Sequence, residues 1–232
     1  MRDADGAAAA AAVDVAGAGA LKNGACGTPQ EIRFSVLLSA MLSSQTRDAA
    51  TAEAMRRLGE LCYPQPLSAG RLAGVSEEAI AHAIRSVSFF RIKARNIAAV
   101  SEKVRTDLEG DIPVTVEGLL ALPGVGPKMA YLVMDIAWDR VVGICVDTHV
   151  HRISNRLGWV QTWNHRRTSS QDPEKTRKAL QAWLPQKHWS EINALLVGFG
   201  QTVCRPVGPR CRECAVRQLC PSAVANGSIA PP

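Results

Sequence analysis

The stretch Leu122–Ala130, which reads Leu-Pro-Gly-Val-Gly-Pro-Lys-Met-Ala, decides how the rest of the chain is interpreted. Two glycines one residue apart, followed at once by a helix-compatible run, predict a tight hairpin between two helices. Glycine suits such a turn because it adopts positive φ and lets the backbone come close to a partner. The amides of Gly124, Val125 and Gly126, added to the N–H groups of the next helix, would form a nest suited to a phosphate.

Lys128 falls in the first turn of that second helix, where the helix dipole disfavours a cation. A lysine whose ammonium is disfavoured offers its free amine more readily, which a Schiff-base nucleophile requires. The alternative is a helix-hairpin-helix phosphate clamp in which Lys128 only contacts the nucleic-acid backbone. This stretch alone supports the two interpretations equally.

Composition favours a packed globular protein. The chain has 232 residues, of which 47% are apolar and 21% charged, enough for one large or two small domains. The net charge of +6 suits a polyanionic partner without proving one. No apolar run approaches the roughly 18 residues of a membrane helix, so no membrane association is expected.

Helical periodicity runs through most of the chain, and no strand alternation or internal repeat is evident, so we predict an all-α protein. Residues 1–27 are rich in alanine and glycine and are expected to be disordered, residues 158–171 form a polar loop, and residues 222–232 form a disordered tail. The predicted helices include 49–61 capped by Asp48, 77–87, 91–109, 127–138, 148–157, 172–184 and 188–203, the last turning Ile192, Leu195, Leu196 and Phe199 inward.

Four of the seven cysteines lie close together in the pattern Cys-x6-Cys-x2-Cys-x5-Cys, and they are Cys204, Cys211, Cys214 and Cys220. Four thiolates can hold tetrahedral zinc or a cubane iron–sulfur cluster. Structural zinc sites more often use two Cys-x2-Cys pairs and only one is present, so the spacing favours a [4Fe-4S] cluster. An odd cysteine total without a secretory signal also indicates a reducing, intracellular setting. Arginines around the cluster, among them Arg205 and Arg212, would make this loop electropositive and able to contact phosphates.

Three further features carry chemical interest. An apolar helix opens onto the polar string Ser43–Arg47, a common way to present side chains at a cleft. Phe89 and Phe90 are either ordinary core residues or a wedge pushed into a base stack. Basic residues on the following helix, including Lys93 and Lys103, belong at least partly to a solvated face.

Asp147 is an obvious N-cap for the helix that follows it, and capping alone would give this residue a purely structural role. His149 and His151 are two residues apart, so on a helix they face different ways and do not form a metal-binding pair.

Together these motifs resemble the endonuclease III family of helix-hairpin-helix DNA glycosylases, over roughly residues 30–221. Leu122 to Lys128 resembles the family's hairpin with its lysine, and Val146 to His149 resembles the family's aspartate block. The spacing of the four clustered cysteines matches that of the family without a gap, and Leu42 to Gln45 resembles the family's Leu-Ser-x-Gln element. The residues Pro127-Lys128-Met129 and His149-Val150-His151 look more like the eukaryotic branch.

The resemblance implies two helical domains flanking a DNA-binding cleft, a six-helix barrel over 28–140 that carries the hairpin and an iron–sulfur domain over 141–221. It implies a bifunctional glycosylase and lyase that removes oxidised pyrimidines from duplex DNA, with Lys128 as nucleophile and Asp147 as its catalytic carboxylate. Damaged double-stranded DNA would be the partner of a monomer, acting in the nucleus or in a mitochondrion or another DNA-containing organelle. The DNA-contacting residues would be Gln45, Phe89, Gly124, Val125, Gly126, His149, Arg205 and Arg212, with Gln45 filling the gap left by the extruded base.

Two other interpretations stay open from the residues. A non-catalytic DNA-binding module could use the hairpin and a structural cluster, although phosphate binding needs neither Lys128 nor Asp147. The adenine-glycosylase branch shares the cluster but generally lacks the lysine and carries a further C-terminal domain.

Overall fold

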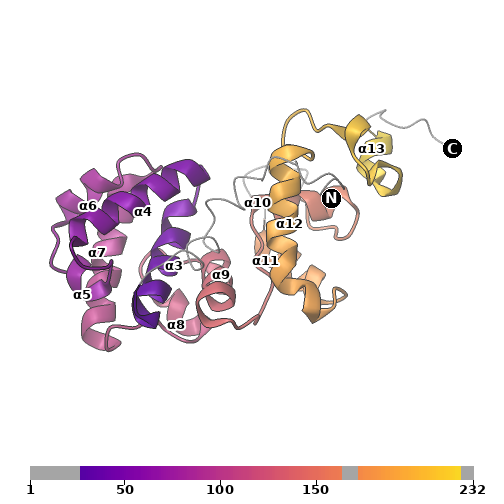
Figure 1. The fold of residues 1–232 in the computed structure, drawn as a ribbon. Helices are drawn as coiled ribbons and strands as arrows, with labels where there is room; N and C mark the ends of the chain where they lie inside the picture. The colour runs from indigo at the N-terminus through magenta and orange to yellow at the C-terminus, as the bar shows by residue number, and fades with distance from the viewer. Residues whose placement is uncertain (1–26, 164–171, 226–232) are drawn as a thin grey trace. The chain divides into compact units, whose positions relative to one another are not determined.

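The computed structural model describes residues 27–163 and 172–225 of the chain, which divides into two compact units between Val142 and Gly143. Every regular element within those ranges is helical, so the all-α prediction is confirmed (Figure 1). No helix in these ranges is long and apolar enough to cross a membrane. Residues 1–26, which were expected to be disordered, and residues 164–171 of the predicted polar loop lie outside the described residues.

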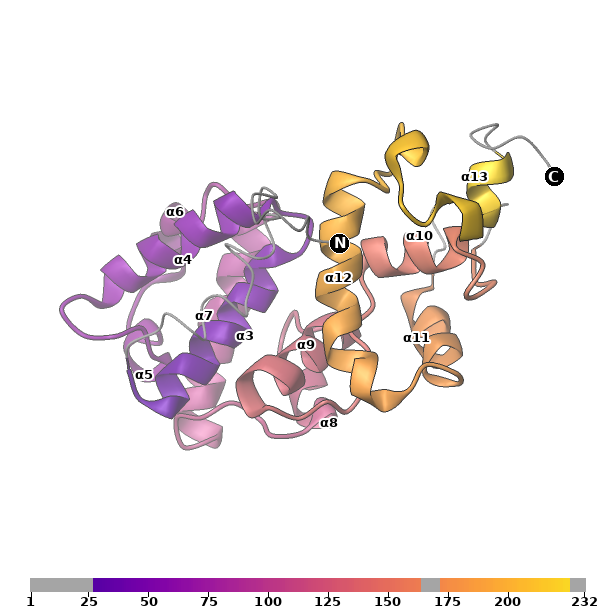
Figure 2. The ribbon, with the colours of Figure 1, turned by 45° about the vertical axis from the view of Figure 1, so that its right-hand side comes forward.

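The first unit, residues 27–142, is built around helix α3 (Pro29–Ser43), in which residues 36–42 are all buried. It packs against α4 (Asp48–Cys62), α7 (Phe90–Asp107) and α9 (Pro127–Trp138), as Figure 2 shows. The short helices α5 (Ala69–Leu72) and α6 (Glu77–Ala83) pack on α7, and α8 (Val116–Leu120) packs on α9. Burial of one continuous apolar cluster across these helices is the main source of stability.

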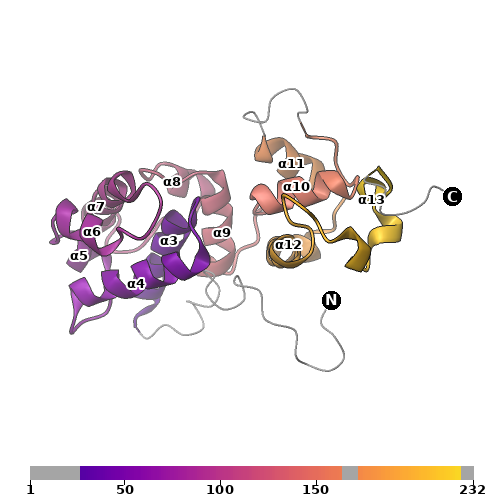
Figure 3. The ribbon, with the colours of Figure 1, turned by 90° about the horizontal axis from the view of Figure 1, so that it is seen from above.

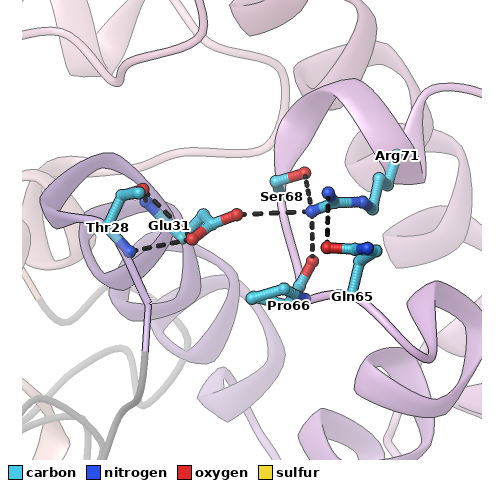
Figure 4. Close-up of polar contacts among 6 residues, drawn as sticks. All are labelled: Thr28, Glu31, Gln65, Pro66, Ser68 and Arg71. Carbon is cyan, nitrogen blue, oxygen red and sulfur yellow. Dashed lines mark hydrogen bonds and ion pairs between the residues drawn. The ribbon is translucent and has the colours of Figure 1, made fainter.

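The start of α3 is fixed by a polar cluster (Figure 4). Thr28 and Glu31 form a capping box, in which the Glu31 carboxylate accepts the Thr28 amide at 2.8 Å. That bond, supported by Arg71, holds the pKa of Glu31 below its usual value. Arg71 of α5 donates to Glu31 at 3.3 Å and to three acceptors of the loop 65–68, so the loop before α5 is tied to the beginning of α3.

The second unit comprises the described residues from 143 onward. It contains α10 (Thr148–Arg156), α11 (Pro173–Gln181) and α12 (Trp189–Thr202), with α10 packed between the other two (Figure 3). Three single-turn 3-10 helices, η1 (Gln186–His188), η2 (Cys211–Glu213) and η3 (Arg217–Leu219), complete it with α13 (Pro221–Ala225). A second apolar cluster forms its core.

Several predicted details are corrected by the structure. Asp48 is the first residue of α4 rather than its cap, because Arg47 holds the N-cap position without a side-chain bond. The helix begun at Ser76 ends at Ala83 rather than at residue 87. Leu195 is 55% exposed rather than inward-facing. The expected tail 222–232 begins with ordered α13, in which Ala223 is buried.

Candidate nucleic-acid interface and metal centre

The hairpin predicted from the two glycines joins α8 to α9. Thr115 caps α8 through a bond from the Gly118 amide at 3.1 Å, and α9 begins at Pro127, directly after Gly126. Gly124 has φ of +77°, and a Cβ on it would lie 2.3 Å from the side-chain nitrogen of Asn96 on α7. The turn therefore requires glycine at position 124 for both conformation and space.

Gly126 is a different case. Its φ is −102°, which any residue adopts, and a Cβ built on it meets no other atom within 4 Å. Nothing within the described residues requires glycine at this position. A glycine that the fold does not need is what a close approach of the backbone to an external partner would require.

Val125 lies between the two glycines, and its side chain is buried in the core. Its side chain is 8% exposed in the core of the first unit, and its amide donates to the Leu122 carbonyl at 3.2 Å. The expected nest of three open amides is therefore corrected: Val125 anchors the hairpin, while Gly124 is exposed and Gly126 half-exposed.

Lys128 is the second residue of α9, so the prediction that it lies in the first helical turn is confirmed, and its side chain is half-buried. No acidic residue lies in that first turn to offset the helix dipole.

Asp147 begins the second unit's first long helix. Its Oδ1 accepts the Val150 amide at 2.8 Å as the N-cap of α10, and the residue is half-buried. The structural interpretation of Asp147 as a cap is thus confirmed. Capping occupies one lone pair of one carboxylate oxygen, so it does not use up the acceptor capacity or the charge of the group.

The two histidines of α10 face different ways, as their spacing predicts. Nδ1 of His149 lies 3.2 Å from the Arg152 guanidinium, which can only donate, so this nitrogen is the acceptor in the contact. His151 is buried and contacts the Thr176 hydroxyl at 2.7 Å. Burial, and after it the neighbouring Arg156, lower the pKa of Arg152, which also donates to the Cys204 carbonyl at 3.0 Å.

The four clustered cysteines line one open pocket, together with residues of α10, α12 and α13. Its remaining wall is largely apolar, with Leu157, Phe199 and Val203 among the lining residues. Arg156 of α10 donates to the Cys204 sulfur at 3.5 Å, and its own carbonyl accepts from the Cys220 thiol at 3.5 Å. Burial raises the pKa of the Cys214 thiol.

No three His, Cys, Asp or Glu side chains among the described residues converge tightly enough to hold a single metal ion. Tetrahedral zinc would require sulfurs at about 2.3 Å from one point. Four thiolates that line one pocket are the donor set of a cubane cluster as well as of tetrahedral zinc, so the residues present fit either group.

Arg205 and Arg212 extend from this cysteine loop with exposed side chains. The Arg205 carbonyl accepts from the Arg156 guanidinium at 2.8 Å, and the Arg212 carbonyl accepts from the Arg217 guanidinium at 3.1 Å. The loop is thereby held by its backbone and leaves positive charge at the surface, as the prediction of phosphate contacts requires.

Gln45 and Phe89 both belong to the first unit and are both exposed, Phe89 to 60%. They share a rare backbone conformation, with φ of +52° for Gln45 and +57° for Phe89. The adjacent Phe90 packs against the core, as one of the two interpretations of this pair expects, whereas Phe89 is exposed.

Lys93, expected among residues of a partly solvated face, is only 7% exposed. The signal was present in the spacing, because Lys93, Ile97, Val100 and Val104 follow one helical stripe and all four are buried. Burial lowers the pKa of Lys93 to about 8.

Residues 38–186 match the model of the HhH-GPD superfamily of base excision DNA repair proteins. The chain is 43% identical over 208 residues to an endonuclease III homolog of Encephalitozoon cuniculi, covering 86% of this chain and 83% of that relative. The chain belongs to the endonuclease III family. The resemblance inferred from the hairpin, the aspartate block and the cysteine spacing is thereby confirmed.

Other members of the endonuclease III family extend the comparison. The chain is 49% identical over 198 residues to the chloroplastic endonuclease III homolog 2 of Arabidopsis thaliana. The aligned region covers 84% of this chain but only 50% of that relative. Among solved structures, a trapped covalent intermediate of endonuclease III with DNA superposes with a TM-score of 0.75 at 30% identity, covering 88% of each chain.

Proposed function

We propose that this endonuclease III family member is a bifunctional DNA glycosylase and AP lyase that removes oxidised pyrimidines from duplex DNA in base excision repair. The observation that carries the proposal is the hairpin: Lys128 lies two residues after Gly126, a glycine that the described fold does not require. Family membership and the likeness to a trapped covalent endonuclease III–DNA intermediate support it.

The chemistry assigned to Lys128 has two stages. A base within a duplex must first be extruded before the sugar can be reached. The neutral amine of Lys128 then attacks C1′, the glycosidic bond breaks, and the base leaves with the bonding electrons and takes up a proton. Loss of the amine proton and opening of the sugar ring give a Schiff base. Removal of a C2′ proton then allows the C3′–O bond to break, which releases the 3′ phosphate and nicks the strand.

Asp147 is assigned the carboxylate role in this scheme. It would accept a proton as the Lys128 amine becomes neutral and would stabilise positive charge developing at the sugar. Its cap bond to Val150 fixes the carboxylate relative to α10, so the side chain is oriented before substrate binds.

We assign a [4Fe-4S] cluster to Cys204, Cys211, Cys214 and Cys220, in the pocket that they line. Such a cluster would supply folding free energy and hold the loop that carries Arg205 and Arg212. The purified protein should be brown with about four irons per chain. Colourless protein with about one zinc per chain would contradict the assignment.

The partner we propose is damaged double-stranded DNA, bound by a monomer in the nucleus or another DNA-containing compartment. Gly124 and Gly126 would contact the phosphate backbone through the hairpin, Gln45 and Phe89 would enter the disturbed base stack, and Arg205, Arg212 and His149 would contact DNA from the second unit. A non-catalytic DNA-binding module would not require Lys128 and Asp147 in these positions.

The direct test uses a 5′-labelled duplex that contains one oxidised pyrimidine. Wild-type protein should release the base and nick the strand without any added AP endonuclease. Base release with an intact strand would reduce the proposal to a simple glycosylase, and absence of both reactions would refute it.

A further inference from the structure

Lys93 forms a buried link between two surface segments of the first unit. Its ammonium donates to the Leu42 carbonyl at 2.6 Å, to the Ser44 carbonyl at 2.7 Å and to the Thr46 hydroxyl at 3.1 Å. Among the described residues no carboxylate forms an ion pair with it, so the charge is satisfied by three oxygen acceptors, one for each N–H. A buried charge is tolerated only with such full satisfaction.

The other end of the link is the turn before α7. The Lys93 amide donates to the Phe89 carbonyl at 3.0 Å, and the Ser88 amide donates to the Thr46 hydroxyl at 3.3 Å. Thr46 therefore accepts from both Lys93 and Ser88. The Lys93 side chain and the Thr46 hydroxyl thus connect the segment 42–46 to the segment 88–93. These two segments lie more than forty residues apart in sequence.

Each connected segment presents one exposed residue in the left-handed region, Gln45 and Phe89. A non-glycine residue in that region costs of order 1–3 kcal/mol and persists only where surrounding contacts impose it. The bonds made by Lys93 flank Gln45 on both sides, at Ser44 and Thr46, so they supply that constraint. On the other segment, the Lys93 ammonium acts through Thr46, whose hydroxyl also accepts from the amide of Ser88, the residue before Phe89. The backbone bond from the residue-93 amide to the Phe89 carbonyl does not depend on the side chain.

We propose that Lys93 is a positioning residue that fixes Gln45 and Phe89 as one rigid pair for entry into the base stack of damaged duplex DNA. The inference rests on the proposed function, because it gives these two residues the work of separating a damaged base from its neighbours. Two side chains that must enter one disturbed step need a fixed separation, and a misplacement of about 1 Å at such a site can cost about 100-fold in rate. Lys93 touches neither substrate nor reacting atoms and acts through the two segments.

The test compares Lys93→Met, which keeps an apolar stem but no donor, with Lys103→Met, the same change at a less buried position of α7. Base extrusion is followed by the fluorescence of 2-aminopurine placed next to an oxidised pyrimidine in a duplex. The lyase step is measured separately on an abasic site in a single strand, where no base stack has to be opened. Lys93→Met should lose at least 10-fold in extrusion and duplex excision while single-strand cleavage stays within about two-fold. Lys103→Met should match wild type in all three.

Equal losses of Lys93→Met on duplex and single strand would reduce the residue to a general stabilising role and overturn the proposal. So would unchanged duplex excision. If Lys93→Met does not fold, Thr46→Val supplies the same test, because it removes the hydroxyl shared by Lys93 and Ser88, and it should show the same selective loss on duplex. Wild-type protein that excises nothing would refute the proposed function, whereas active wild type with an equally active, folded Lys93→Met refutes only the positioning role.

Discussion

Asp147 has two assignments that a single substitution separates. As a cap it accepts one backbone amide at 2.8 Å, a task that Asn performs about as well. As a catalytic carboxylate it must carry negative charge, which Asn lacks. Asp147→Asn should therefore stay within about 1 kcal/mol of wild-type stability while base excision falls about 100-fold or more. Normal excision with unchanged thermal stability would leave Asp147 only its structural role, which single-turnover excision assays would reveal.

The lowered pKa of Lys93 predicts how the folding stability changes with pH. Its pKa lies near 8 in the folded protein and near 10.5 in the unfolded chain, and none of its side-chain partners titrates. Between these two pH values the unfolded state binds more protons, so the folded state gains stability as pH rises, at a limiting slope of about 1.4 kcal/mol per pH unit. Below pH 8 both states are protonated and this slope vanishes.

The measurement is the thermal midpoint of wild type minus that of Lys93→Met, recorded from pH 7 to pH 10. The difference should be flat up to about pH 8 and then move in favour of wild type. A difference that moves against wild type over that range would show that the three oxygen acceptors outweigh burial and raise the pKa.

At the scale of elements, alanine substitutions at the two hairpin glycines are predicted to have different effects, one on stability and one on DNA binding. Gly124→Ala introduces both positive φ strain and a clash with Asn96, so it should cost at least about 1–2 kcal/mol of stability. Gly126→Ala meets no atom within 4 Å and should fold like wild type. Its DNA affinity should nonetheless drop about 10-fold, or about 1.4 kcal/mol, because its methyl group stands where a phosphate approaches. Salt-matched binding titrations would show an unaltered affinity if the hairpin does not approach the DNA backbone.

The sequence correctly predicted helix starts that are set by neighbouring residues, such as a capping side chain or a proline after glycine. Proline after glycine placed the start of α9 correctly, and Asp147 caps α10 as expected. The spacing of α7 places Lys93 on the buried stripe, but the carbonyls that accept from its ammonium could not be predicted locally, because they lie at the end of α3, about fifty residues earlier. Leu195 is exposed for a related reason: the periodicity of α12 defines an apolar face that is wider than the core it meets. The open amide expected at Val125 was wrong because the turn itself uses it.

At the scale of the whole molecule, DNA affinity should depend steeply on salt, since the chain carries a net charge of +6 and exposed arginines on the cysteine loop. Each phosphate contact contributes a slope of about −0.9 in log K against log salt. Arg212→Gln should weaken damaged and undamaged duplex alike and flatten the slope by about one such unit. Arg105→Gln, an exposed arginine paired with Glu102 on α7, is the control and should leave the slope unchanged. A loss confined to damaged DNA would place Arg212 at the base pocket instead.

The four cysteines, the hairpin and the aspartate block are distributed over both units, yet the proposed reaction depends on one atom, the amine nitrogen of Lys128. Borohydride reduction of the protein on a duplex with an abasic site tests that claim most directly, because only a Schiff base is trapped as a stable covalent complex. Wild type should give the trapped complex with the DNA attached to the peptide that contains Lys128. Lys128→Ala should bind the same duplex but give neither trapping nor strand cleavage. A trapped complex from Lys128→Ala, or DNA attached to another lysine in wild type, would contradict the account.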